Sequence, residues 1–525
     1  MSKSLATAIA QRNPRIATPV RHRRPLPGTP PGCPEVVHLT AEYWPLARTG
    51  GLGEAVSGLA KMQAASGIPA TVVMPLYRAV RESTPELRPV GEPFSITMGL
   101  RNEVARLFLL EASGEGPRVF LLEHSDYFDR PGIYGIGGAD YPDNARRFAF
   151  FARAALSVLP TIAPSAQILH AHDWHAALAP VFLRTAFAGQ WYYDRLATVS
   201  SIHNAGFQGH FPAETLADIG LPPELCDPGL FDWYGQINLL KGGIGFSDAV
   251  VTVSPTHARE LRSVGGGFGL HDTFDALGNR LTGILNGIDV EIWNPQSDPV
   301  IAASYTRNDF GGKQRCKTAL QRTFGLPESE TVPLLAMSSR LTTQKGLDLI
   351  LGGLTTHTDA QFVFLGRGEP RYEKALTDLA LTAPYRVGVQ LVFTDDREHE
   401  VMAGADILLM PSQYEPCGLT QMRAQLYGTL PVARRVGGLA DTIEDGLTGF
   451  LFDDYSPDAL QRAVDHAMTL YQQPDAWQRM MRQAMMRRFG WSRSGERYAR
   501  TYRQALAHHL ADRTHLDAEL LLLAP

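Results

Sequence analysis

After a polar, proline-rich start, short apolar runs alternate with longer segments of helical spacing. In the first such unit, Val36–Leu39 predicts a strand, residues 48–54 a glycine-rich loop, Ala55–Ser66 a helix that ends at Gly67, and Ala70–Met74 the next strand. A glycine just past the last helical residue is typical of a helix C-terminus. This alternation predicts repeated βαβ units around a parallel sheet.

The same alternation returns in the second half of the chain. Strands are predicted at residues 333–337, 361–365, 389–393 and 406–410, each followed by a loop and a helix. We therefore expect two doubly wound α/β halves, with the hinge between them in the glycine-rich stretch 265–294. Binding groups in open parallel sheets gather at the carboxyl ends of the strands, so a ligand is expected in the cleft between the halves.

Composition narrows the class of protein. With 44% hydrophobic residues, 20% charged residues and a formal net charge of -5, the 525-residue chain is typical of globular proteins and calls for no nucleic-acid or membrane partner. The four cysteines stand far apart, which argues against a disulfide framework and favours a reducing cytoplasm. Residues 1–34 carry Lys and Arg, no Asp or Glu, and many prolines, which predicts a disordered extension rather than an organelle transit peptide.

Glycine-rich strings stand at two predicted turns. Arg48-Thr-Gly-Gly-Leu-Gly-Glu54 lies between a strand and a helix, where backbone amides and the helix dipole can approach a phosphate. Gly437-Gly-Leu-Ala-Asp441 repeats the pattern later in the chain. A tight strand-to-helix turn needs glycine without any ligand as well, so a purely structural role stays open for both strings.

A histidine-rich string, His170-Ala-His-Asp-Trp-His175, follows a short apolar strand, and Ser201-Ile-His-Asn204 follows another. The His-x-His-x-x-His spacing on a loop would suit zinc. Without a second cluster of acids or cysteines, we favour recognition of sugar hydroxyls by the His, Asp and Asn side chains. Buried histidines satisfied by the backbone are the alternative for His170 and His175.

Two further loops carry charged candidates. Arg340 and Lys345 follow a predicted strand, and two cations five residues apart can close on a diphosphate and stabilise it as a leaving group. Glu415 follows another strand just before a helix, whose dipole would keep the carboxylate ionised to accept sugar hydroxyls or steady a developing positive charge. Solvated, idle charges are the alternative for the two cations. Cys417 needs no reactivity, since a small residue suits the turn.

Taken in order, these strings resemble glycosyltransferase family 5, the glycogen and starch synthases, over about residues 35–503. The strings that carry the resemblance are Arg48-Thr-Gly-Gly-Leu-Gly53, His170-Ala-His-Asp-Trp-His-Ala176, Ile202-His-Asn204, Lys241-Gly-Gly243, Val253-Ser-Pro255, Leu285-Asn-Gly-Ile-Asp289, Ser339-Arg-Leu341, Gln344-Lys-Gly-Leu347 and Glu415-Pro-Cys-Gly-Leu-Thr-Gln421. The resemblance implies a GT-B fold of two Rossmann-like domains facing a cleft. It places the acceptor side at 35–280, the nucleotide-sugar side at 281–490, and a final helix near 491–505 that crosses back to the first domain.

The resemblance also implies an activity: transfer of glucose from ADP-glucose, or in some members UDP-glucose, to the non-reducing 4-hydroxyl of an α-1,4-glucan, with retention at the anomeric carbon. No Asp-x-Asp triplet is present, so no metal cofactor is expected and Arg340 with Lys345 would neutralise the diphosphate. Glu415 resembles the carboxylate that contacts the transferred glucose. His203, with Asp173 and Asn204, would hold the glucose hydroxyls. The remaining donor-binding candidates are Arg48, Gly50, Gly51, Asn286, Gln344, Phe393 (which would stack on the base) and the amides of Cys417, Gly418 and Leu419.

Retention without an evident nucleophilic carboxylate favours a front-face reaction, in which the departing phosphate takes the acceptor proton. Two positions depart from the family's first motif: Arg48 stands where Lys is usual, and Glu54 where Asp is common. The exchange to Arg leaves the choice between ADP-glucose and UDP-glucose open. Two other functions compete, a GT-B enzyme with a different acceptor and a catalytically silent glucan-binding or regulatory protein. The presence of His203, Arg340, Lys345 and Glu415 favours an active synthase.

Overall fold

The computed structural model describes residues 34–84, 86–111 and 116–522. The extension predicted at residues 1–34 therefore lies outside the described residues, apart from Pro34. The chain forms two compact units. Unit 1 comprises the described residues up to Val253, Leu261–Ile284 and the segment from Ser492 onward, and unit 2 comprises Ser254–Glu260 and Leu285–Trp491.

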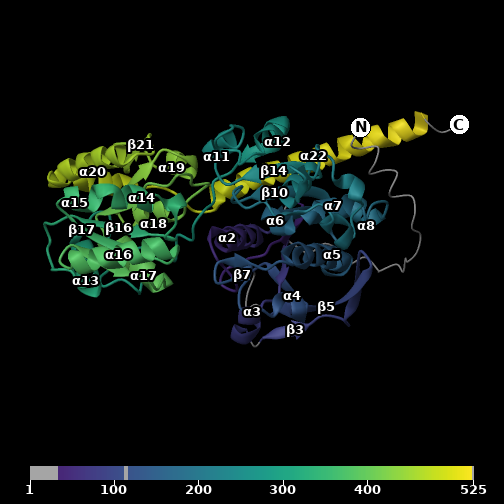
Figure 1. Cartoon of the computed structure of the whole chain (residues 1–525), viewed down its shortest axis with the longest axis horizontal. Coiled ribbons are helices and arrows are strands. Elements are labelled where there is room, and N and C mark those ends of the chain that lie inside the picture. The colour runs from purple at the N-terminus through teal and green to yellow at the C-terminus, as the bar shows by residue number, and fades with distance from the viewer. Residues whose placement is uncertain (1–33, 85, 112–115, 523–525) are drawn as a thin grey trace. The chain divides into compact units, whose positions relative to one another are not determined.

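Unit 1 is built on a ten-stranded sheet (Figure 1). Its strands lie in the order β15 (Leu281–Gly283), β14 (Ala249–Thr252), β10 (Ala197–Ile202), β9 (Ala166–His172), β1 (Glu35–Leu39), β2 (Ala70–Pro75), β6 (Arg118–Glu123), β5 (Arg101–Leu110) and β3 (Leu87–Pro89), with β4 (Phe94–Met98) also paired to β5. Neighbours run parallel from β15 to β6, and the pairs of β5 with β6, β3 and β4 are antiparallel. Every residue of β1, β2 and β10 is buried, as expected for parallel strands covered on both faces.

Helices cover the sheet of unit 1. Helices α5 (Asn144–Ile162), α7 (Leu178–Arg184) and α10 (Leu239–Gly245) form one packed series, while α2 (Gly51–Ala65) packs against α22 (Ser492–Leu522). Helix α22, drawn in yellow in Figure 1, also contacts β9, β10 and β14. The last helix of the chain is thus part of unit 1, and it is longer than the segment 491–505 predicted from the sequence.

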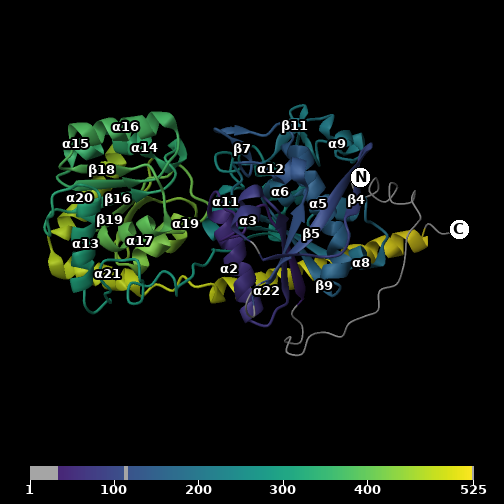
Figure 2. The same cartoon turned by 90° about the horizontal axis from the view of Figure 1, so that it is seen from below.

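Unit 2 contains a six-stranded sheet that is parallel throughout (Figure 2). The strand order is β18 (Val387–Gln390), β17 (Gln361–Leu365), β16 (Leu334–Ser338), β19 (Ile407–Met410), β20 (Leu430–Arg434) and β21 (Phe450–Phe452). The helices of this unit that matter below are α16 (Pro370–Thr382), α17 (Asp395–Gly404), α18 (Thr420–Leu426), α19 (Gly437–Thr442) and α20 (Pro457–Tyr471). Both predicted parallel sheets are therefore present.

Several predicted boundaries differ from the structure, and two of the differences concern site residues. Helix α2 begins at Gly51 instead of Ala55. The glycines that we assigned to a loop therefore lie in the first turn of the helix. Gly53 allows the preceding segment to pack closely there, since a Cβ on Gly53 would lie 3.0 Å from the carbonyl oxygen of Ala47. Strand β18 (Val387–Gln390) ends at Gln390, where its partner β17 ends opposite it at Leu365. Phe393, which was predicted to end that strand, lies in the loop before α17.

The antiparallel extension formed by β3, β4 and β5 was not predicted. In the middle of β5, the buried residues Ala105 and Leu107 alternate with the exposed residues Val104 and Arg106. Such alternation is typical of antiparallel sheets with one solvated face, whereas our prediction followed continuous apolar runs. Among the described residues, no helix combines the length and the apolar composition that crossing a membrane requires.

Candidate active site

Glu415 of unit 2 is held in an ion pair at the end of the loop that follows β19. Its Oε2 lies 2.6 Å from Lys345 Nζ and accepts a hydrogen bond of 3.1 Å from Ser412 Oγ. The side chains of Lys345 and Glu415 are only 16% and 8% exposed. A charge-assisted hydrogen bond of this length is stronger than a neutral one, and the low exposure protects it from screening by salt. The structure thus brings two predicted catalytic residues together.

The loop that carries Lys345 is joined to the Glu415 loop by a backbone hydrogen bond and by one from the Gln344 side chain. Gln413 N donates to Gln344 O over 2.8 Å, and Gln344 Nε2 donates to Tyr414 O over 3.2 Å. Gly346 is required at this contact: its φ is 77°, and a Cβ would lie 2.1 Å from the carbonyl oxygen of Pro411. Gln344, a predicted donor-binding residue, and Lys345, a predicted catalytic residue, are therefore placed by one glycine turn.

Arg340 follows β16, and its side chain is exposed. The structure therefore places this cation differently from Lys345, which is nearly buried against Glu415. Arg340 and Lys345 lie on the same loop, as predicted, but only Lys345 is tied to the Glu415 carboxylate.

The second glycine turn, at the start of α19, packs against the backbone beside Glu415. Gly437 has a φ of 44°, and a Cβ there would lie 1.9 Å from Glu415 O. A Cβ on Gly438 would lie 2.0 Å from Cys417 O, and Gly438 N donates to Glu415 O over 3.0 Å. Close approach of two backbone segments accounts for this glycine pair, which was one of the two roles left open by the sequence.

Asn286 and Cys417 lie next to each other in unit 2. The backbone amide of Asn286 donates to the Cys417 thiol, and burial raises the pKa of that thiol to about 12. Cys417 is therefore a neutral thiol, as expected for a structural residue. Asn286 is 7% exposed, and its Oδ1 has no hydrogen-bond partner among the described residues. A buried acceptor without a partner costs about 1–3 kcal/mol, which a ligand donor would recover.

The other donor candidates of unit 2 lie at turns. Gly418 has a φ of 67°, and a Cβ on it would lie 2.4 Å from Gln421 Oε1, so the turn requires glycine. Leu419 precedes the first residue of α18. Phe393 is 38% exposed between β18 and α17. An aromatic ring with that exposure has a face or edge available for contact.

In unit 1, Asp173 orders the turn after β10. It has a φ of 55° at the end of β9, and its Oδ1 accepts from the backbone amide of His203 over 2.7 Å. Burial raises the pKa of Asp173 to about 7. Hydrogen bonds from the amides of His203 and Asn204 lower this pKa, and the nearby Glu42 carboxylate raises it further. Asp173, His203 and Asn204 are thus brought together, as predicted.

Glu42 was missed by the sequence analysis. It is 3% exposed, and its two oxygens accept from Thr49 N over 2.8 Å and from Thr49 Oγ1 over 2.7 Å. Tyr134 OH also donates to Glu42, over 2.6 Å. These bonds fix the loop that leads to Gly50 and Gly51. Its position shortly after the first predicted strand could have indicated a site residue, but the sequence analysis considered only the glycine-rich string that follows.

Arg48 and Glu54, the two departures from the family motif, contact each other. Arg48 Nη1 donates to Glu54 Oε1 over 2.8 Å, with the side chains 27% and 21% exposed. Glu54 lies in the first turn of α2. The two departures from the motif, Arg48 and Glu54, therefore form an ion pair. The sequence analysis considered the two positions separately and did not predict this pair.

The histidines do not form the set that their spacing indicated. His170 and His172 lie within β9, while His175 stacks on Tyr134 with ring centroids 4.5 Å apart. Among the described residues, the three histidines whose nitrogens lie within 4.8 Å of one another are His38, His170 and His172. All six ring nitrogens of these three already form hydrogen bonds. The zinc alternative based on His-x-His-x-x-His is therefore wrong, because His170 and His172 lie on β9, whereas His175 lies in the short helix that follows it and is not part of the cluster.

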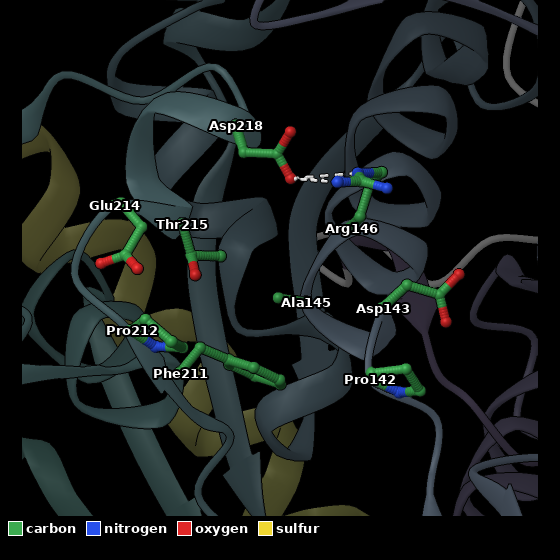
Figure 3. Close-up of a pocket in the computed structure, with 9 residues that line it drawn as sticks. All are labelled: Pro142, Asp143, Ala145, Arg146, Phe211, Pro212, Glu214, Thr215 and Asp218. Atoms are coloured by element: carbon green, nitrogen blue, oxygen red, sulfur yellow. Dashed lines mark hydrogen bonds and ion pairs between the residues drawn. The ribbon is translucent and has the colours of Figure 1, made fainter.

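A surface pocket of about 410 Å³ opens elsewhere in unit 1 (Figure 3). Arg146 reaches across it to Asp218, with Nη2 2.6 Å from Oδ2, and Phe211 lines its apolar side. None of the predicted site residues lines this pocket. We therefore define the candidate site by the contacts of the predicted residues described above and not by this pocket.

Comparison with known proteins places these features in a family. Residues 35–276 match the model of the starch synthase catalytic domain, and residues 322–484 match that of glycosyl transferases group 1. The glycogen synthase of Syntrophotalea carbinolica is 41% identical over 484 residues, which cover 91% of this chain and 100% of that protein. Glycogen synthase 2 of Geobacter sulfurreducens is 39% identical, covering 90% of this chain and 99% of that protein.

Solved structures agree with this assignment. The catalytic domain of starch synthase IV from Arabidopsis thaliana, bound to ADP and acarbose, superposes with a TM-score of 0.83 at 31% identity, covering 90% of this chain and 100% of that one. Sucrose-phosphate synthase from Thermosynechococcus elongatus, at 16% identity and a TM-score of 0.58, shares the fold alone. The two parallel α/β sheets are those of the predicted GT-B fold. The chain therefore belongs to the glycogen and starch synthase family.

Proposed function

We propose that this chain transfers glucose from ADP-glucose to the non-reducing 4-hydroxyl of an α-1,4-glucan, with retention of the anomeric configuration. Full-length identity of about 40% to glycogen synthases assigns it glucose transfer to an α-1,4-glucan. The ADP and acarbose bound to the Arabidopsis starch synthase support binding of a nucleotide and a glucan here. The described cysteines are free thiols, which supports a cytoplasmic location.

The Lys345–Glu415 pair is the observation that carries the proposal. It holds a cation and an anion side by side in a nearly buried position. Lys345, with Arg340 on the same loop, would neutralise the diphosphate of the donor, while Glu415 would contact the transferred glucose. Because the pair is already formed, these groups need little reorganisation when charge develops during the reaction.

Further donor contacts are proposed in unit 2. The unpartnered Oδ1 of Asn286 would accept from the donor, and Phe393 would stack on the base. Gln344 and the amides of Cys417, Gly418 and Leu419 would line the sugar and phosphates. The nucleotide-sugar side is proposed as residues 281–490.

Residues 35–280 are proposed as the acceptor side, with residues 491–525 completing it. Arg48 and the turn at Gly50 and Gly51 are proposed as phosphate contacts. His203 and Asn204 would contact the glucose hydroxyls, and Asp173 would hold both residues by accepting hydrogen bonds from their backbone amides.

Front-face transfer is the mechanism that these contacts favour. The bond between the anomeric carbon and the phosphate oxygen breaks, the acceptor 4-hydroxyl oxygen bonds to the same face of that carbon, and its proton passes to the departing phosphate. A two-step route would need a carboxylate free to attack the opposite face. Glu415 accepts from both Lys345 and Ser412, which makes it a weak nucleophile and a good electrostatic partner.

Incorporation of labelled glucose into glycogen tests the proposal. ADP-glucose and UDP-glucose are compared in parallel for the wild type, Glu415→Ala and the matched control Asp378→Ala. The control breaks an exposed Lys374–Asp378 pair on α16. We expect incorporation from ADP-glucose, a loss of roughly 10²–10³ in kcat/KM for Glu415→Ala, and an unchanged control. Folded wild-type protein that incorporates glucose from neither donor would refute the proposal.

A further inference from the structure

A chain of buried hydrogen bonds in unit 1 connects the last helix to His203. Gln63 Nε2 donates to Tyr502 OH over 3.0 Å, and His38 Nε2 lies 2.7 Å from Gln63 Oε1. His38 Nδ1 lies 3.0 Å from His172 Nε2, and His172 Nδ1 lies 3.0 Å from His203 Nε2. We call Tyr502, Gln63, His38, His172 and His203 the relay. Its first four members are at most 1% exposed.

The histidines of the relay are neutral near pH 7. Burial lowers the pKa of His38 to about 4 and that of His203 to about 3. Burial, reinforced by the neighbouring rings, holds the pKa of His172 well below its usual range. A neutral imidazole carries one N–H and one acceptor nitrogen. Each relay histidine can therefore donate from only one of its two nitrogens.

Counting protons along the relay fixes every donor. The Gln63 carbonyl oxygen can only accept, so the proton of His38 is on Nε2. His38 Nδ1 must then accept from His172 Nε2–H, and His172 Nδ1 must accept from His203 Nε2–H. His203 is left with a proton on Nε2 and a lone pair on Nδ1.

The Gln63 amide, which donates to Tyr502 OH, sets the direction of the bonds at the start of the relay. A phenol has a single proton, and because Tyr502 OH accepts from Gln63, that proton is available for His170 Nδ1, 2.9 Å away. His170 in turn donates from Nε2 to Ser201 Oγ over 2.7 Å. In this arrangement Tyr502 OH accepts from the Gln63 amide and donates to His170. Reversal of that amide would reverse every bond of the relay and move the proton of His203 to Nδ1.

We propose that Gln63 and Tyr502 are positioning residues that set the tautomer of His203, so that its Nδ1 accepts a hydrogen bond from a hydroxyl of the transferred glucose. The inference rests on the proposed function, which assigns His203 to the sugar. Tyr502 lies on α22, the last helix of the chain. The position of α22 within unit 1 is therefore linked to His203 through hydrogen bonds, in addition to the contacts of α22 with the sheet.

The tautomer can be read directly by long-range ¹H–¹⁵N correlation NMR on the full chain labelled with ¹⁵N-histidine, with His203 assigned from a His203→Gln spectrum. The variants are Gln63→Met, Tyr502→Phe and the matched control Tyr498→Phe. Tyr498 is buried one turn earlier on α22 and is not a member of the relay. We expect the Nε2–H form in the wild type and the control, and mixed tautomers in Gln63→Met and Tyr502→Phe.

Kinetics separate positioning from folding. We expect kcat with ADP-glucose to fall about tenfold in Gln63→Met with little change in KM, a loss typical of removing a group that orients a functional histidine. Tyr502→Phe, which keeps the ring, should show a smaller loss in the same direction. An Nδ1–H wild type, or an unchanged kcat in both variants despite mixed tautomers, would overturn the inference. Absence of glucose transfer by the wild type would instead refute the proposed function, and the NMR result would still report the tautomer.

Discussion

Breaking the Lys345–Glu415 pair from one side should cost more free energy of unfolding than removing both partners. At 2.6 Å and an effective dielectric constant of about 20, the attraction between unit charges is about 6 kcal/mol. Desolvation of the two ions offsets most of this, but a single substitution leaves the remaining ion buried and unpaired. We therefore expect Glu415→Leu and Lys345→Met each to lose about 3 kcal/mol, and the double variant to lose much less.

Urea unfolding of the full chain, followed by circular dichroism, measures these losses, and glycogen labelling measures activity in the same samples. The double variant should regain stability and remain inactive, which would separate the structural role of the pair from its catalytic role. The same cycle at the exposed Lys374–Asp378 pair should give a coupling below about 0.5 kcal/mol. Additive losses of less than about 1 kcal/mol at Lys345 and Glu415 would refute the reasoning.

The remaining predictions concern three other features. Arg48→Lys and Glu54→Asp should each lower kcat/KM for ADP-glucose, and the double variant should lose less than the sum of the two, because either single change already disrupts the same 2.8 Å ion pair; additive kinetic losses would contradict this. Gly437→Ala should lower the unfolding midpoint and the activity together, since its Cβ would lie 1.9 Å from Glu415 O; a wild-type midpoint in thermal unfolding would argue against it. Burial lowers the pKa of His175 from 6.5 to about 3, so the unfolded chain binds a proton that the folded chain does not, and stability falls as the pH drops through this range. At pH 5.5 this group should cost about 1.4 kcal/mol, and His175→Phe should show a smaller difference in unfolding midpoint between pH 7.5 and pH 5.5 than the wild type.

The central strands could be predicted because burial on both faces leaves a continuous apolar run. The prediction for residues 361–365 coincides with β17, all of which is buried. The prediction for residues 36–39 lies within β1. The polar residues after such strands follow from the same logic, since parallel strands end at one edge of a sheet.

Features that depend on contacts between distant segments could not be predicted. The bond between Gln63 and Tyr502 joins residues 439 positions apart, and neither side chain belongs to a motif. Gly51 was assigned to a loop because nothing in the local sequence shows that the preceding segment packs on the first turn of α2. The pairing of Arg48 with Glu54 is local, only six positions apart, and was within reach of a sequence argument. The roles assigned to the individual site residues stay predictions.

Product analysis after transfer from ADP-glucose labelled with ¹³C at the anomeric carbon tests the central claim most directly. Maltoheptaose serves as the acceptor, and NMR identifies the linkage that the labelled carbon forms. The account predicts that the label moves to the non-reducing end of the oligosaccharide in an α linkage to the 4-oxygen. Label that remains in ADP-glucose, is released as free glucose or appears in a β linkage would contradict it.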